Sequence, residues 1–169
     1  MNASRLSDAL LGWYDGHGRS LPWRGTCAPY RILISEVMSQ QTQITRVADR
    51  YGQFIERFPN VDDLATASTG EVLPEWPSLG YNRRARNLHL CAIQVVASGW
   101  PNTLEGLVAL PGVGPYTAAA IGSICFDLVA PAVDTNLRRV MSRWHGSPLS
   151  DAGTRRFAEP LINTQRPGD

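Results

Sequence analysis

Two carboxylates occupy sequence settings in which they could share acid and anion chemistry. Glu36 lies inside the apolar run 32–38 (ILISEVM). A Glu among such neighbours is expected to be partly buried, and burial raises the pKa of a carboxyl group, so this one could donate a proton near neutral pH. The alternative interpretation is a surface Glu on an amphipathic helix.

Asp134 follows an apolar stretch and precedes a segment of helical periodicity. This pattern predicts an N-cap, and the role is compatible with chemistry because backbone donors hold a capping carboxylate in place. A fixed anion is what a cationic transition state requires. Asn136, in the first turn, could bind a phosphate, position a water molecule or simply be exposed.

A glycine-rich turn occupies residues 110–117 (LPGVGPYT). Gly112 and Gly114 permit positive φ and close approach of another backbone, and the amides of such a turn suit a phosphate oxygen. An ordinary helix–helix turn is the alternative. Tyr116, which follows the turn, is either a core aromatic or the wall of a pocket.

A short polar segment, 39–43 (SQQTQ), follows the run that holds Glu36. Its amide side chains can bond to both partners of a base pair. Solvent-facing loop residues are the common alternative for such a composition.

The elements that must position these residues are helices. Apolar residues recur at i, i+3 and i+4, and no strand pair has a hairpin signal, so we predict an all-α fold of many short helices. Ser68 and Glu71 predict a capping box at the start of a helix. Pro74 should shorten or bend that helix. Four further helices are predicted over 30–38, 44–58, 85–96 and 115–126.

Bulk properties restrict the class of protein. The chain has 169 residues, 43% of them hydrophobic, and a net charge of +1. No apolar signal core opens it and no apolar run approaches about 18 residues, so we expect no membrane partner and a cytoplasmic location. The three cysteines lack C-x-x-C spacing, so we expect no metal site.

Four segments in register resemble the MutY-type adenine DNA glycosylases of the helix-hairpin-helix (HhH-GPD) superfamily. They are 34–43 (ISEVMSQQTQ), 79–89 (LGYNRRARNLH), 110–114 (LPGVG) and 133–140 (VDTNLRRV). The resemblance implies a bilobal all-α fold that is incomplete at the C-terminus. A helical barrel lobe would span 25–129 and contain the helix-hairpin-helix, 103–126. Residues 1–24 and 130–169 would form the second lobe.

The resemblance also implies roles for individual residues. Glu36 would protonate the adenine ring, and Asp134 would stabilise the sugar cation. Tyr116 falls where bifunctional relatives carry a Schiff-base lysine, so a lyase step should be absent or weak. The residues expected at the DNA are Gln41 and Tyr81, inserted beside the flipped base, with Thr42, Arg24, Gly112, Gly114, Asn136 and Arg84.

The implied function is hydrolysis of the N-glycosidic bond of adenine mispaired with 8-oxoguanine or guanine, by base flipping and acid-assisted depurination. The partner would be double-stranded DNA holding such a mispair, bound by a nucleoid-associated monomer. Glu36 and Asp134 should then meet in one cleft beside the glycine turn. The alternatives are a thymine-mismatch glycosylase of the same superfamily and a non-catalytic DNA-binding remnant.

Two features depart from the family pattern. Ser39 stands where an apolar wedge residue is usual. The sequence given ends at Asp169, before the four-cysteine loop that holds the family's [4Fe–4S] cluster. We therefore expect no cofactor within these residues, because the cluster would need cysteines beyond residue 169.

Overall fold

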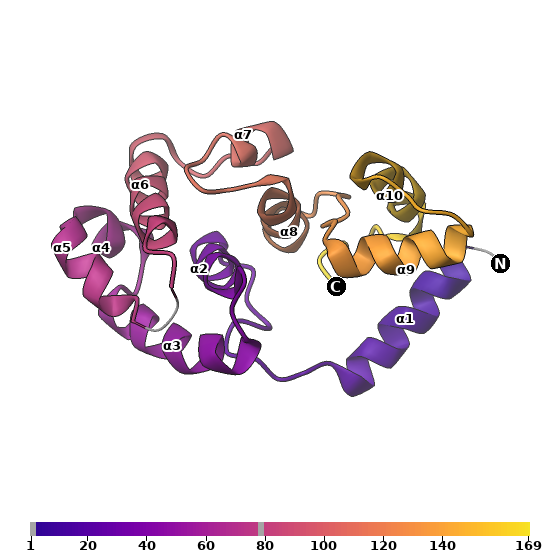
Figure 1. Cartoon of the computed structure of the whole chain (residues 1–169), viewed down its shortest axis with the longest axis horizontal. Coiled ribbons are helices and arrows are strands. Elements are labelled where there is room, and N and C mark those ends of the chain that lie inside the picture. The colour runs from indigo at the N-terminus through magenta and orange to yellow at the C-terminus, as the bar shows by residue number, and fades with distance from the viewer. Residues whose placement is uncertain (1–2, 78–79) are drawn as a thin grey trace. The chain divides into compact units, whose positions relative to one another are not determined.

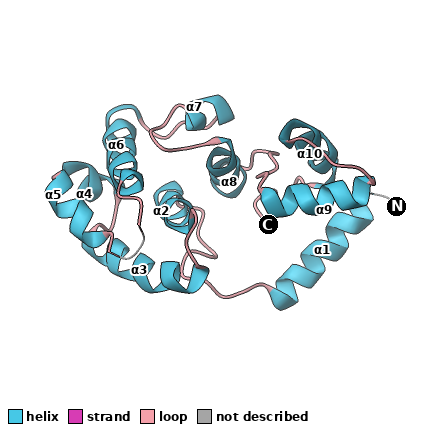
Figure 2. Cartoon of the chain, in the orientation of Figure 1, coloured by secondary structure: helices cyan, strands magenta, loops and turns pink. Residues whose placement is uncertain are grey.

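The computed structural model describes residues 3–77 and 80–169. These residues form ten α-helices and two 3-10 helices, and they contain no strand (Figures 1 and 2). The predicted all-α class is therefore confirmed. Across the same residues, no helix has both the length and the apolar character needed to cross a membrane.

The chain divides into two compact units. The central unit comprises the described residues of 20–101 together with 105–113, and the terminal unit comprises residues 3–19, 102–104 and 114–169. In this division residues 20–24 group with the central unit, and residues 102–104 and 114–129 group with the terminal unit; the expected lobes, 25–129 and 1–24 with 130–169, stay a prediction.

The central unit contains the helices between residue 29 and the glycine turn. Its core includes Phe54, whose ring packs edge-on against the ring of Trp76 with the centroids 5.9 Å apart. The ring of Phe58 is tilted against that of Phe54, with the centroids 5.1 Å apart. The elements are α2 (Pro29–Ser39), α3 (Ile44–Arg57), α4 (Val61–Thr66), α5 (Thr69–Val72), η1 (Leu73–Glu75), α6 (Arg83–Ser98) and α7 (Leu104–Val108). Helix α4 packs on α6, and α2 contacts both α3 and α6.

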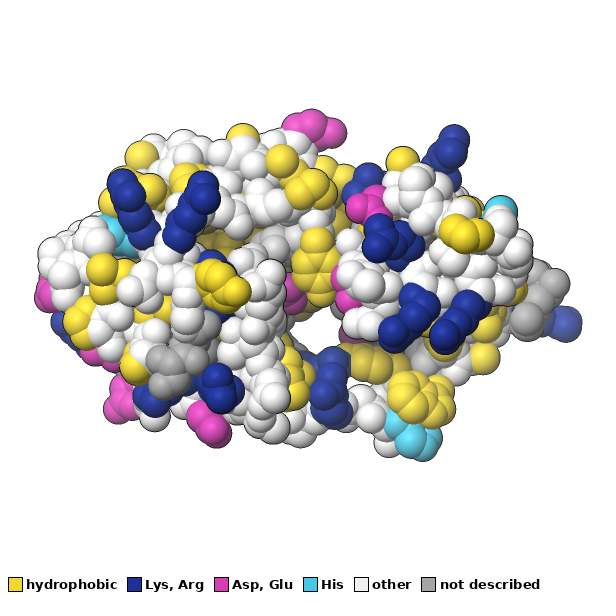
Figure 3. Space-filling view, viewed as in Figure 1, with side chains coloured by type: hydrophobic (Ala, Val, Ile, Leu, Met, Phe, Trp, Pro, Cys, Tyr) yellow, Lys and Arg dark blue, Asp and Glu magenta, His cyan; other side chains and the backbone are white. Residues whose placement is uncertain are grey.

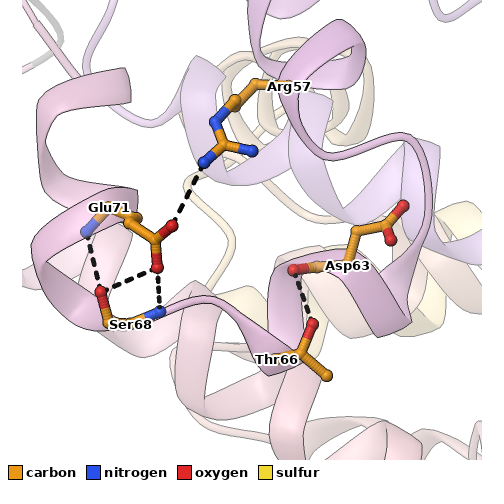
Figure 4. A network of polar contacts seen from close by, with 5 residues as sticks. All are labelled: Arg57, Asp63, Thr66, Ser68 and Glu71. Atoms are coloured by element: carbon orange, nitrogen blue, oxygen red, sulfur yellow. Dashed lines mark hydrogen bonds and ion pairs between the residues drawn. The ribbon is translucent and has the colours of Figure 1, made fainter.

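Local signals in the sequence set several of these boundaries. The Ser68 side chain accepts the Glu71 amide, and the Glu71 carboxylate accepts the Ser68 amide, so the predicted capping box is present. Arg57 donates to the same carboxylate at 3.3 Å (Figure 4). Pro74 lies within η1, so α5 ends after one turn, as the proline predicts. Gly99 closes α6 with φ 79°.

The terminal unit consists of α1 (Ala3–His17), α8 (Pro115–Phe126), α9 (Thr135–His145), α10 (Asp151–Ala158) and η2 (Glu159–Leu161). Pro115 begins α8, as predicted, and its fixed φ suits that position. Arg166 ties the C-terminal segment to α1 through two bonds to the Asp15 carboxylate, at 2.7 and 3.0 Å.

The apolar faces of two terminal-unit helices are only partly covered. On α1, Leu10 is 55% exposed and Trp13 is 59% exposed, while Ser7 is buried. On α9, Met141 is buried but Val140 and Trp144 are largely exposed. For α9, helical periodicity therefore located the helix correctly without indicating how much of its apolar face is buried.

Candidate functional site

Glu36 lies near the C-terminal end of α2, among residues that are almost all buried. Seven of the eleven residues of α2 are buried, including Leu33, Val37 and Met38. Burial raises the pKa of the Glu36 carboxyl to about 7. The predicted partial burial is confirmed, and a carboxyl group with this pKa retains its proton at a pH where an ordinary Glu has lost it.

The polar segment that follows α2 is a tight turn with one strained residue. Gln41 is exposed and has φ 55°, a left-handed conformation that is uncommon outside glycine. Thr42 donates its amide to the Ser39 carbonyl at 3.3 Å and its hydroxyl to the Gln40 carbonyl at 3.2 Å. Thr42 is therefore held by the turn, whereas the Gln41 side chain faces solvent.

Arg84, in the first turn of α6, donates into this turn. Its Nη1 donates to the carbonyl oxygens of Val37, at 2.9 Å, of Met38, at 3.3 Å, and of Gln40. Its Nη2 donates to Thr42 Oγ1 and to the Gly80 carbonyl, both at 3.3 Å. The family resemblance predicts Arg84 at the DNA; in the structure its guanidinium joins two loops of the central unit.

Tyr81 projects from the second of these loops. It is 69% exposed, and its φ is 50°, again in the left-handed region. Gly80, immediately before it, is bonded through its carbonyl oxygen to the indole Nε1 of buried Trp76 at 3.2 Å. Trp76 therefore anchors the Tyr81 loop. This role of Trp76 could not be predicted, because nothing in the sequence around Trp76 indicates a bond to Gly80.

The glycine turn has one constrained and one open glycine. Gly112 has φ 78°, and a Cβ placed there would lie 2.7 Å from the Cβ of Asn87 on α6. Gly114 is the N-cap of α8, with φ −89°, and a Cβ placed there would meet no atom within 4 Å. The turn itself is closed by a bond from the Val113 amide to the Leu110 carbonyl at 3.1 Å.

Asp134 is the N-cap of α9, as predicted. Its Oδ1 accepts the Leu137 amide at 2.7 Å, and its Oδ2 accepts Asn136 Nδ2 at 3.0 Å. The side-chain oxygen Oδ1 of Asn136 in turn accepts a hydrogen bond from Arg139 Nη2 at 3.0 Å. Asn136 thus links the carboxylate to a helix that carries several basic side chains, some of which are seen over α9 in Figure 3.

The two remaining candidates are exposed. Tyr116 lies in the first turn of α8 and is 41% exposed, which excludes a fully buried core position. Arg24 is exposed at the end of a turn in which its amide donates to the Leu21 carbonyl at 2.9 Å.

The structure brings together part of the predicted site. In the central unit the Arg84 guanidinium is bonded to Thr42 and to Gly80, and these two residues are the chain neighbours of Gln41 and Tyr81. Asp134 and Asn136 are joined in the terminal unit. Glu36 belongs to the central unit and Asp134 to the terminal unit, so the meeting of the two acids in one cleft stays a prediction.

Comparison with known families gives this arrangement a context. Residues 34–161 match the model of the HhH-GPD superfamily base excision DNA repair proteins. This segment is more than half of the chain and contains Glu36, the glycine turn and Asp134. The chain belongs to the HhH-GPD superfamily.

Curated relatives of this HhH-GPD chain include adenine DNA glycosylases. That of Mycolicibacterium smegmatis is 45% identical over 153 residues, which cover 86% of this chain and 52% of the relative. That of Mus musculus is 40% identical, over 95% of this chain and 35% of its own length. The predicted resemblance is confirmed, and the chain spans about half the length of the mycobacterial relatives it matches.

Solved structures confirm the HhH-GPD fold. A thermostable thymine-DNA glycosylase superimposes with a TM-score of 0.87 at 26% identity, covering 98% of this chain and 81% of that one. A non-covalent endonuclease III–DNA complex gives a TM-score of 0.79 at 22% identity, covering 99% and 81%.

The cysteines do not fit the [4Fe–4S] cluster that the resemblance implies. Cys27 is exposed, Cys91 is buried on α6, and Cys125 lies on α8. Within residues 3–77 and 80–169, no group of three or more His, Cys, Asp or Glu side chains could hold a metal ion. A four-cysteine cluster therefore cannot be assigned to these residues, and ligands beyond residue 169 stay a prediction.

Proposed function

We propose that this chain carries the catalytic core of a monofunctional adenine DNA glycosylase that acts on double-stranded DNA, at adenine mispaired with 8-oxoguanine or guanine. The observation that carries the proposal is Glu36, a partly buried carboxyl group on an otherwise apolar stretch of α2, whose pKa burial raises to about 7. Curated relatives named as adenine DNA glycosylases, at identities from 36% to 45%, support adenine as the base.

The proposed reaction begins with extrusion of the adenine, because a stacked base cannot reach a buried acid. Glu36 donates its proton to a ring nitrogen of the adenine. The bond between the base and C1′ of the sugar then breaks, and its electron pair leaves with the protonated base. Water attacks the sugar cation at C1′, and the proton that it releases returns to the Glu36 carboxylate. The products are free adenine and an abasic site.

Asp134 would stabilise the sugar cation between these two steps. Its carboxylate is fixed by the Leu137 amide and the Asn136 side chain, so it needs no reorganisation when positive charge develops. The proposal requires that the two units place this carboxylate and Glu36 on the same nucleotide. Tyr116 supplies no amine, so the DNA strand should stay intact until alkali is added.

The exposed residues Gln41 and Tyr81 would contact the duplex around the flipped base. Both project from turns that bonds to Arg84 and Trp76 hold in place. Phosphates would be bound by the amides of the glycine turn and by basic side chains such as Arg24. We expect the protein to bind each mispair as a monomer. We also expect it to act in association with the nucleoid.

The test is single-turnover excision from four end-labelled duplexes that differ only in the central pair. They hold adenine opposite 8-oxoguanine, guanine or thymine, and thymine opposite guanine. We expect alkali-dependent cleavage at adenine opposite 8-oxoguanine or guanine, and none at the other two pairs.

Two other outcomes would identify the alternatives. Cleavage at thymine opposite guanine would indicate a thymine-mismatch enzyme, an alternative that the 26% identity to a thymine-DNA glycosylase motivates. Salt-dependent binding without release of any base would indicate a DNA-binding module. Either outcome would overturn the proposed function.

A further inference from the structure

We propose that Arg84 is a positioning residue, which sets the conformations of the Gln41 and Tyr81 turns together, and that it is not a phosphate ligand. The inference rests on the proposed function for its consequence in catalysis. Its structural part concerns only the central unit.

The guanidinium of Arg84 forms hydrogen bonds with backbone carbonyl oxygens at the end of α2. It donates to the carbonyl oxygens of Val37, Met38 and Gln40. The last carbonyl groups of a helix have no hydrogen-bond donor within the helix, and they carry partial negative charge. A cationic donor placed there both completes their hydrogen bonding and offsets that charge. Charge-assisted bonds of this kind are stronger than bonds between neutral groups.

The Arg84 guanidinium is bonded to the residues next to two left-handed positions. Gln40 and Thr42, which flank Gln41, are both partners of Arg84, and so is Gly80, which precedes Tyr81. Gln41 and Tyr81 have φ of 55° and 50°. Left-handed residues other than glycine persist only where their surroundings hold them.

Asp127 provides an internal comparison. It is the third described non-glycine residue with positive φ, at 53°, and it is the C-cap of α8. A left-handed residue is the ordinary way for a helix to end, so Asp127 needs no external support. Gln41 is the third residue of the turn 39–42, a position that requires positive φ and is usually taken by glycine. Neither Gln41 nor Tyr81 is a glycine, and the turns that hold them are both bonded to the Arg84 guanidinium.

Aromatic rings enclose the same group. The Arg84 guanidinium carbon lies 5.8 Å from the centroid of the buried Trp76 ring and 5.7 Å from that of Tyr81. A DNA phosphate would have to replace bonds that already hold the two turns. A salt-dependent phosphate contact is therefore the competing role that the experiment must separate from positioning.

The first experiment is hydrogen exchange on Arg84→Met, which retains the length of the side chain and removes its donors. The reporters are the Thr42 amide, bonded to Ser39, and the amide of residue 84, bonded to Tyr81. We expect both to exchange faster by roughly tenfold or more, because local opening becomes easier. Unchanged exchange at either reporter would overturn the inference, whether or not the chain removes adenine.

The matched control is Arg57→Met in the same unit. Arg57 also donates to a partner, Glu71 at 3.3 Å, and also lies over an aromatic ring, Phe58 at 5.1 Å. We expect its substitution to leave exchange at both reporters unchanged. Arg84→Lys serves as a second variant if Arg84→Met does not fold, because a lysine keeps the charge but lacks the planar fork.

The second experiment separates positioning from phosphate binding. Arg84→Met should slow single-turnover excision by roughly 10- to 100-fold, the range expected from lost charge-assisted bonds. The slope of log affinity against log salt for an undamaged duplex should stay unchanged, whereas loss of one phosphate contact would reduce it by about one. A reduced slope would therefore overturn the inference.

A third measurement asks whether Arg84 acts through the two turns. In a chain that already carries Gln41→Ala and Tyr81→Ala, adding Arg84→Met should slow excision no further, because residues that act as a unit are not additive. An undiminished effect in that background would also count against positioning.

Discussion

Gly112 and Asn87 are in such close contact that a Cβ on the glycine would lie 2.7 Å from the Asn87 Cβ. Gly112 also has φ 78°, which disfavours any side chain. We expect Gly112→Ala to lower the free energy of unfolding by roughly 1–3 kcal/mol, from backbone strain and overpacking together. Urea unfolding monitored by circular dichroism measures this loss, and a variant as stable as the wild type would contradict it.

Gly114, two residues later, should behave in the opposite way. A Cβ there meets nothing within 4 Å, so we expect Gly114→Ala to change the free energy of unfolding by less than about 0.5 kcal/mol. If the turn approaches a phosphate closely, the same methyl group should weaken binding to a duplex. Fluorescence anisotropy of a labelled duplex measures the affinity. Full affinity in a stable variant would argue against a close phosphate contact.

Glu36 should make folding stability depend on pH. Its folded-state pKa is about 7, against 4.5 for an unperturbed Glu, so between these values the folded chain holds a proton that the unfolded chain has lost. The contribution to stability is full below the lower value and is lost as pH rises through the upper one. Glu36→Gln, which cannot ionise, should therefore exceed the wild type above pH 7 by up to about 3 kcal/mol.

Unfolding at about pH 4.5 and 8 tests this expectation, since the two proteins should converge at the lower value. Glu56→Gln, a substitution at an exposed position on α3, is the control and should show no such difference. Equal stability of Glu36→Gln and the wild type at the higher pH would show that the carboxyl is not buried as described.

The same proton should control the rate of excision. We expect the single-turnover rate of the wild type to decline as pH rises through about 7, because Glu36 can donate only while protonated. Glu36→Gln should be slower by about 10²–10⁴-fold at neutral pH, the usual contribution of a general acid. Rates measured over a pH series on adenine opposite 8-oxoguanine check both points. Wild-type activity in Glu36→Gln would remove Glu36 from the mechanism.

Asp134 should combine a structural role and a chemical role that mutation can separate. Asn caps a helix about as well as Asp, so Asp134→Asn should preserve α9 while removing the negative charge. We expect unfolding to change little and excision to slow by about 10²–10³-fold, as when an electrostatic partner of a transition state is lost.

The control for Asp134 is the cap of the next helix. The Ser150 hydroxyl accepts the Gly153 amide at 3.1 Å at the start of α10. Ser150→Ala should cost about 1 kcal/mol of stability and leave excision unchanged. If both variants lost excision alike, the effect of Asp134 would be attributable to its cap.

Helix positions were predictable because the signals that set them are local. Pro115 begins α8, Gly99 closes α6, and the Ser68–Glu71 capping box opens α5, each through bonds or torsions within a few residues. The burial of Glu36 was predictable for a similar reason, since its apolar neighbours share its helix. In these cases the residues within about one helical turn of the feature are enough to predict it.

Arg84 shows what local sequence does not contain. An arginine in the first turn of a helix is typical of a solvated face or a phosphate contact. Its actual partners, near residues 37–42 and at residue 80, depend on how α2 packs against α6. The same limit applies to Trp13, whose exposure depends on the elements around α1 and not on the periodicity of the helix.

The ion pair between Arg166 and Asp15 spans 151 residues of chain. The terminal unit can therefore form only after α9, α10 and the segment after them have been synthesised, whereas the central unit is nearly continuous in sequence. On a translating ribosome, α1 emerges before the helices that it packs against have been synthesised. We therefore expect the central unit to become protease-resistant before the terminal unit. Proteolysis of nascent chains stalled at increasing lengths would reveal this order, and simultaneous protection of both units would contradict it.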